Sequence, residues 1–163
     1  MRCFIALDIP KELKDTLFEL QTKLKNKNAK IKWIAKKNLH VTMRFLGDCK
    51  ENKIEVVQEK LKHINFKQIR VKLDELSIFP HEQAPRILWI GLKPEEPILR
   101  LAQRIDEETL EINARKQRFT SHLTLGRIKT LKSKQVYLNA LKEVKLEKRV
   151  FILTSFTLSL IHI

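Results

Sequence analysis

The sequence is poor in the residues on which several classes of proteins depend. It has three glycines among 163 residues, too few for the glycine-rich loops that hold phosphates in nucleotide-binding folds. Its two cysteines, Cys3 and Cys49, have no metal-site spacing, and we expect two reduced thiols. The scarcity of glycine excludes P-loop and Rossmann chemistry.

Long apolar runs are missing as well. No stretch approaches the roughly 20 apolar residues that a membrane helix needs. The opening MRCFIALDIP is interrupted by Asp8 and Pro10 and lacks the layout of a signal peptide. With 43% hydrophobic residues, the chain can bury one core, so we expect a single cytoplasmic domain over 1–163 that does not bind membranes.

Acidic residues are scarce relative to basic ones. The 33 lysines and arginines outnumber 19 aspartates and glutamates, which leaves a formal net charge of +14. Such a charge favours polyanionic partners, of which nucleic acid is the obvious candidate. The alternative is a lysine-rich surface that only meets solvent.

The hydrophobic pattern predicts strands that alternate with helices. Leu13, Leu17, Leu20 and Leu24 recur at steps of four, three and four residues, which indicates one apolar stripe on a helix. The same kind of pattern predicts strands over 2–8, 31–34, 39–46, 69–78, 86–92, 119–128 and 148–160, and further helices over 54–64, 98–114 and 133–143. Short connections between strands, such as 80–85, favour antiparallel pairing and therefore an α+β fold.

Two of the predicted strands carry a histidine followed two residues later by a threonine. NLHVTMRFLG contains His40 and Thr42, and SHLTLGRI contains His122 and Thr124. Residues i and i+2 of a strand point to the same face, so each histidine shares a face with its threonine. Because a buried imidazole and hydroxyl need partners, such a face is expected to border a solvated cleft. One such strand is more often structural, but the repetition favours function.

Strict alternation also assigns the residues that follow each motif. It places Arg44 on the face of His40 and Phe45 on the opposite, core face. In the second strand it turns Arg127 away from His122, unless Gly126 disturbs the pleat.

Two histidines that face one cleft permit a specific chemistry. An imidazole has an ordinary pKa near 6.5, so at neutral pH one ring can remove a proton while the other delivers one. Each role typically contributes on the order of 10²–10⁴ in rate. Threonine hydroxyls beside the rings can bind an anionic oxygen. Such a site suits hydrolysis of a strained phosphodiester without metal or cofactor, and His63 and His81 stand alone rather than in a ligand cluster.

Four segments carry a resemblance to a known family. MRCFIALDIP, KWIAKKNLHVTMRFLGD, PRILWIGL and FTSHLTLGRI resemble, in this order, the RNA 2′,3′-cyclic phosphodiesterases (2′-5′ RNA ligase-like) of the two-histidine phosphoesterase superfamily. The resemblance implies a bilobal fold with two antiparallel sheets, helices on the outer faces and pseudo-two-fold symmetry around a central cleft. Each lobe would contribute one His-x-Thr motif. The sequence departs from the family in ending at FTLSLIHI, and we interpret His162 there as incidental.

The resemblance also implies roles for the motif residues. His40 would be the proton donor that protonates the departing 3′-oxygen, and His122 the proton acceptor that activates water. Thr42 and Thr124 would hold the phosphate oxygens. A near-symmetric site can run in either direction, so the two histidine roles are interchangeable at this point.

Two residues near the motifs, Arg127 and Phe45, each have two interpretations. Arg127 matches a basic residue that closes the second motif in the family, and is either a phosphate ligand or a surface charge. Phe45 is a candidate for stacking on the terminal base, although alternation places it in the core. Trp33 and Trp89 are interpreted as packing residues.

The implied activity is hydrolysis of RNA 2′,3′-cyclic phosphate ends to 2′-phosphomonoesters by a monomer. Candidate substrates include tRNA fragments and cyclic nucleotides. One alternative is the joining of 2′-5′ RNA ends at the same site, since ligation and hydrolysis would share the histidines. A second alternative is a catalytically silent module that binds RNA ends by charge and stacking alone.

Overall fold

The structure is a computed structural model, and it describes residues 1–79, 86–114 and 119–161. The predicted connection 80–85, with His81, and the C-terminal His162 lie outside the described residues. Along the described chain the elements follow in the order β1 (Arg2–Leu7), α1 (Lys11–Leu24), β2 (Ala29–Trp33), the 3₁₀ turn η1 (Lys36–Asn38), β3 (Val41–Asp48), α2 (Glu51–Lys62), β4 (Ile69–Phe79), β5 (Ile87–Lys93), α3 (Glu96–Glu108), β6 (His122–Leu131), α4 (Lys134–Glu143), β7 (Phe151–Leu153) and β8 (Phe156–Ile161).

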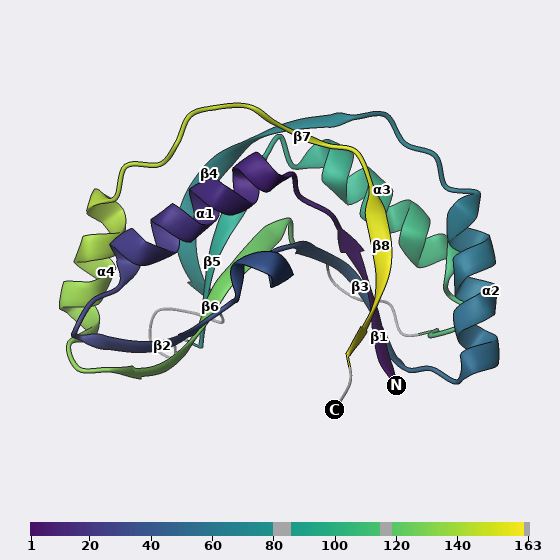
Figure 1. The fold of residues 1–163 in the computed structure, drawn as a ribbon, viewed down its shortest axis with the longest axis horizontal. Helices are drawn as coiled ribbons and strands as arrows, with labels where there is room; N and C mark the ends of the chain where they lie inside the picture. Colours follow the sequence, from purple (N-terminus) through teal and green to yellow (C-terminus); the bar gives the residue numbers. More distant parts are fainter. Residues whose placement is uncertain (80–85, 115–118, 162–163) are drawn as a thin grey trace.

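The strands form two antiparallel sheets. One sheet has the order β3-β1-β8 and the other the order β2-β6-β5-β4-β7. Figure 1 shows an arch in which α1 and α4 lie on the side of the five-stranded sheet and α2 and α3 on the side of the three-stranded sheet. The α+β fold with two antiparallel sheets, predicted from the sequence, is confirmed.

The chain crosses between the two sheets several times. β1 belongs to the three-stranded sheet, β2 to the five-stranded sheet and β3 again to the first, and β8 returns at the end to pair with β1. The two sheets are therefore interleaved in sequence rather than built from successive halves. In the described residues, none of the helices has the length and apolar character to cross a bilayer.

The helix α1 buries its predicted apolar stripe. The four leucines of α1 are at most 5% exposed and belong to one core that also contains the free thiols of Cys3 and Cys49. α3 ends at Glu108 rather than at 114. The Thr109 hydroxyl donates a hydrogen bond to the Ile105 carbonyl over 2.6 Å, and the chain then turns away.

The prediction of a single strand over 148–160 is wrong. The segment forms two strands in different sheets, because β7 pairs with β4 and β8 pairs with β1. Polar residues near the division attach the chain to the end of β1. The Asp8 carboxylate accepts hydrogen bonds from the hydroxyls of Ser155 and Thr157, over 3.0 and 3.1 Å. Alternating hydrophobicity cannot reveal such a change of partner.

A β-bulge changes which side chains of β3 share a face. Thr42 is opposite Ala6 and Arg44 is opposite Ile5, so Met43 is an extra residue in the ladder. An extra residue reverses the alternation beyond it. We call the side of β3 and β6 to which the His-x-Thr pairs point the histidine face.

The bulge at Met43 exchanges the predicted positions of Arg44 and Phe45. Arg44 is 1% exposed, forms an ion pair with Asp106 on α3 and donates a hydrogen bond to the Asn113 carbonyl. Phe45 is opposite Phe4 on the histidine face and is 54% exposed. The expectation that Arg44 shares the face of His40 and that Phe45 lies in the core was therefore wrong.

A second bulge occurs at the corresponding place in β6. Thr124 is opposite Trp89 and Gly126 is opposite Leu88, so Leu125 is the extra residue. Beyond it, Arg127 is on the histidine face, which corrects the expectation from strict alternation. Gly126 allows β2 to approach, because a Cβ there would lie 2.5 Å from Cγ2 of Ile31 on that strand.

The reversed alternation predicts opposite stability effects for two neighbouring residues. Arg44→Met leaves the partly buried Asp106 without its cation, and we expect a loss of about 3–5 kcal/mol in the free energy of unfolding. Phe45→Ala removes an exposed ring and should cost less than about 1 kcal/mol. Urea denaturation followed by circular dichroism measures both. A larger loss for Phe45→Ala than for Arg44→Met would contradict the bulge.

Candidate active site

His40 is fixed by its own backbone and by β1. Its Nδ1 donates a hydrogen bond to the Asn38 carbonyl over 2.6 Å, since a carbonyl oxygen can only accept. Its Nε2 lies 3.0 Å from the Thr42 hydroxyl. The imidazole stacks on the Phe4 ring with centroids 5.1 Å apart. The ring is therefore held in one orientation with Nε2 as its reactive nitrogen.

His122 repeats this arrangement in the other sheet. Its Nδ1 donates to the Thr120 carbonyl over 2.7 Å, so here too the carbonyl two residues earlier binds the ring. The Trp89 ring contacts the imidazole edge-on, with centroids 5.5 Å apart. Both histidines thus use Nδ1 for support, which leaves Nε2 of each for chemistry.

The two motifs meet in one small pocket. It has a volume of about 40 Å³ and is lined by His40, Thr42, His122 and Thr124, together with Ile34 and Asn38. A cavity needs roughly 10–15 Å³ to hold one water molecule, so this pocket has room for a small anion. The structure therefore brings together the four motif residues selected from the sequence, while the roles assigned to them stay predictions.

The electrostatic surroundings of His40 favour its neutral form in the free protein. Burial lowers the pKa of His40 below its ordinary value of 6.5, and Lys14 acts in the same direction. The Asn38 carbonyl and the Asp8 carboxylate partly oppose this effect. Lys14 also donates a hydrogen bond to the Lys37 carbonyl over 3.1 Å, which ties α1 to the turn that leads into His40.

Gln21 supports the pocket from behind, and no pattern in the sequence indicates this role. The side chain, on α1, is 3% exposed, and its Nε2 donates to the carbonyls of Ile34 and Leu125, each over 2.9 Å. Ile34 lines the pocket and Leu125 is the bulge residue of β6. One buried amide therefore joins α1, the pocket wall and the bulge.

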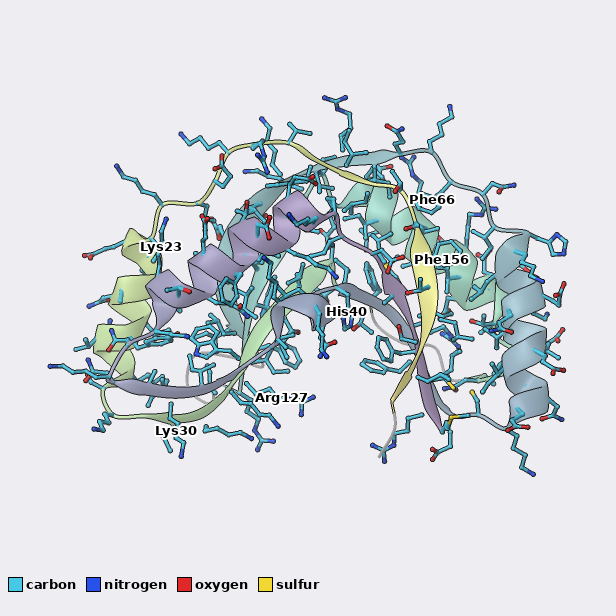
Figure 2. All side chains as sticks on the ribbon, viewed as in Figure 1. Lys23, Lys30, His40, Phe66, Arg127 and Phe156 are labelled. Atoms are coloured by element: carbon cyan, nitrogen blue, oxygen red, sulfur yellow. The ribbon has the colours of Figure 1, made fainter. Side chains whose placement is uncertain are left out.

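Arg127 and Phe45 lie on the histidine face without lining the small pocket itself. Phe45 is next to Phe4, with ring centroids 6.1 Å apart, and Phe4 in turn stacks on His40. Figure 2 shows Arg127 and His40 projecting to the same side of the molecule. Arg127 and Phe45 therefore lie around the pocket rather than at its centre.

Sequence reasoning missed the residues that touch the histidine rings. The sequence pattern gives Phe4 no role beside His40, and Trp89, predicted to be a packing residue, contacts His122. Strand register, which the sequence pattern did not supply, places both rings. Over the described ranges, no three His, Cys, Asp or Glu side chains gather as a metal site would require.

Comparison with known proteins identifies the class. Residues 7–89, about half of the chain, match the family described as LigT-like phosphoesterase. The chain belongs to this family, and the resemblance drawn from the four sequence segments is confirmed.

Several curated relatives cover most of the chain. An RNA 2′,3′-cyclic phosphodiesterase of Methanocaldococcus jannaschii is 31% identical over 146 residues, which are 89% of this chain and 82% of the relative. One of Archaeoglobus fulgidus is 31% identical over 130 residues, 79% of this chain and 73% of the relative.

Solved structures show the same fold at lower identity. The protein TT0787 of Thermus thermophilus has a TM-score of 0.76 and 24% identity, covering 97% of this chain and 87% of its own. Ligand-free LigT of Escherichia coli has a TM-score of 0.74 and 22% identity, covering 96% and 85%. LigT has also been solved in complex with 3′-AMP.

The two hydrogen bonds of Gln21 predict a stability effect. Gln21→Leu keeps a similar volume but removes the donor from two backbone carbonyls, so we expect a loss of about 1–3 kcal/mol in the free energy of unfolding. Chemical denaturation measures the loss. Lys23→Ala on the exposed side of the same helix is the control and should stay within about 0.5 kcal/mol of wild type. Equal stability of Gln21→Leu and wild type would contradict this role.

Proposed function

We propose that the protein hydrolyses 2′,3′-cyclic phosphate ends of RNA to 2′-phosphomonoesters by general acid and base catalysis at His40 and His122, without a metal ion. The observation that carries the proposal is the pocket in which two imidazoles, both supported through Nδ1, stand beside two threonine hydroxyls. The names of the curated relatives support the same substrate.

The proposed reaction is an in-line displacement at phosphorus. Nε2 of His122 accepts a proton from a water molecule, whose oxygen forms a bond to phosphorus. The bond from phosphorus to the 3′-oxygen breaks, and His40 donates the proton of its Nε2 to that oxygen. The product carries a 2′-phosphate and a 3′-hydroxyl, and the two histidines have exchanged protonation states.

The surrounding residues assist through charge and hydrogen bonding. Thr42 and Thr124 donate hydroxyl hydrogens to the non-bridging phosphate oxygens, on which charge develops in the transition state. Arg127, on the histidine face, supplies a cation at the rim. Phe45 and Phe4 form an aromatic surface beside His40 on which the terminal base can stack.

The proposed acid must be protonated when substrate is bound. Burial lowers the pKa of His40 in the free protein, but a phosphate anion between the two rings favours the imidazolium form. Substrate binding therefore favours protonation of His40, the proposed acid. The Thr42 hydroxyl is compatible with both states of His40, because it can donate to neutral Nε2 or accept from protonated Nε2.

The two histidines provide the direct test. We expect His40→Ala and His122→Ala each to lower kcat by at least about 10²-fold while the circular dichroism spectrum is retained. His63→Ala, an exposed histidine after α2, is the matched control and should keep full activity. The assay uses RNA with a 2′,3′-cyclic end in excess EDTA, with mass spectrometry and nuclease mapping of the product.

Three outcomes of this assay count against the proposal. Full activity of either histidine variant excludes the acid–base pair, and loss of activity in EDTA that added metal restores excludes metal independence. Joined strands in the presence of a 5′-hydroxyl acceptor, rather than hydrolysed ends, identify a ligase at this site.

The lowered pKa of His40 gives a second prediction. In the free protein we expect His40 to titrate below 6.5 and, on saturation with inorganic phosphate, to titrate at a higher pH. NMR of the histidine ring protons measures both values, with His40→Gln identifying the signal. Because the unfolded state takes up this proton first, His40 also lowers the stability of the native state as the pH falls below about 6.5. A His40 that stays neutral with phosphate bound would reverse the acid and base assignment.

A further inference from the structure

β2 and β6 carry four cations and no acidic residue. Their sequences, AKIKW and HLTLGRIKTL, include Lys30, Lys32, Arg127 and Lys129. All four side chains are exposed. β2 is also the edge strand of the five-stranded sheet, so its outer side is open to a ligand.

The strand register places three of these cations on the histidine face. Lys32 is directly opposite Arg127, which the bulge at Leu125 brings to that face. Lys30 is two residues from Lys32 in the same strand and therefore points to the same side. We call Arg127, Lys32 and Lys30 the cationic row. Figure 2 shows Lys30 and Arg127 projecting to the same side of the molecule as His40.

No ion pair among the described residues neutralises the charge of the cationic row. In the part of the chain that the structure describes, ion pairs occupy lysines such as Lys36 and Lys60, but none includes a member of the row. Exposed cations without carboxylate partners are the usual means of binding a nucleic-acid backbone.

The two walls of the site differ in chemistry. On the histidine face, the three-stranded sheet presents the rings of Phe4 and Phe45. The five-stranded sheet presents Trp89 beside His122 and then continues beyond Thr124 into the cationic row. A base therefore fits the first wall and phosphates fit the second. Lys32 and Lys30 are separated by roughly 6.6 Å along the strand, a spacing similar to that of successive phosphates in an extended strand.

We propose that the cationic row binds the backbone phosphates that precede the cyclic end, so that the preferred substrate is single-stranded RNA rather than a cyclic mononucleotide. The inference rests on the proposed function, which places the cyclic phosphate in the histidine pocket. Because a 2′,3′-cyclic phosphate is always a 3′ terminus, all other phosphates of the strand lie on one side of it. The cationic row offers these phosphates a path along β6 and β2.

The test compares two substrates in one double variant, Lys30→Gln/Lys32→Gln. For a ten-nucleotide RNA with a cyclic end, we expect kcat/KM to fall about tenfold through KM, with kcat unchanged. For adenosine 2′,3′-cyclic phosphate, we expect kcat/KM within about twofold of wild type. The slope of log kcat/KM against log salt for the RNA should become shallower by about 1.4, since roughly 0.7 is lost for each phosphate contact to a single strand.

Lys23→Gln/Lys148→Gln is the matched control. It removes the same charge from two exposed lysines that border a different hollow, between α1 and the segment after α4, and should leave both substrates unchanged. An equal loss in the control reduces the effect to net charge and overturns the proposal. In Lys30→Gln/Lys32→Gln, an equal loss of kcat/KM for the mononucleotide, or no loss for the RNA, also overturns the proposal.

Failure of the proposed function is distinguishable from failure of this inference. If wild type hydrolyses neither substrate, the proposed function is wrong. Fluorescence anisotropy with a labelled ten-nucleotide RNA then still tests the row, because binding should weaken about tenfold in Lys30→Gln/Lys32→Gln and not in the control variant. Unchanged binding overturns the inference.

Discussion

The site depends on an extra residue at the fourth position of each motif, counted from the histidine, in one strand of each sheet. Strand geometry alone would point every second side chain after the histidine to the cleft, so the sixth residue of each motif would face the core. The bulges at Met43 and Leu125 reverse this alternation at the same place in both sheets. As a result, Phe45 and Arg127 join the histidine face, one apolar and one cationic.

The bulges have to be stabilised, because an extra residue leaves backbone groups out of the regular ladder. At Leu125 the carbonyl accepts hydrogen bonds from the Ile34 amide and from Gln21 on α1. In the other sheet, the Arg44 side chain next to the bulge is anchored in the core by Asp106 on α3. In each case a buried polar side chain connects a helix to the irregular strand, so the helices help to shape the pocket.

Much of the architecture follows from periodicity in the sequence. The apolar stripe of α1 and the recurrence of His-x-Thr predict elements and site residues because both depend only on local spacing. Local spacing does not predict the faces on which Arg44, Phe45 and Arg127 lie, since a bulge is defined by the partner strand. The division of 148–160 into β7 and β8 is likewise decided by which strands lie next to the segment. Gln21 gives no signal at all, because an amide on a helix is ordinarily a surface residue.

The interleaving of the two sheets has a consequence for how activity can be lost. The walls of the pocket come from both sheets, and the chain passes between the two sheets several times, so we expect the sheets to unfold together. Core substitutions away from the two bulges should therefore reduce the number of working molecules, while each molecule that remains folded keeps its normal substrate affinity. Because the pocket takes residues from both sheets, neither sheet alone can form it.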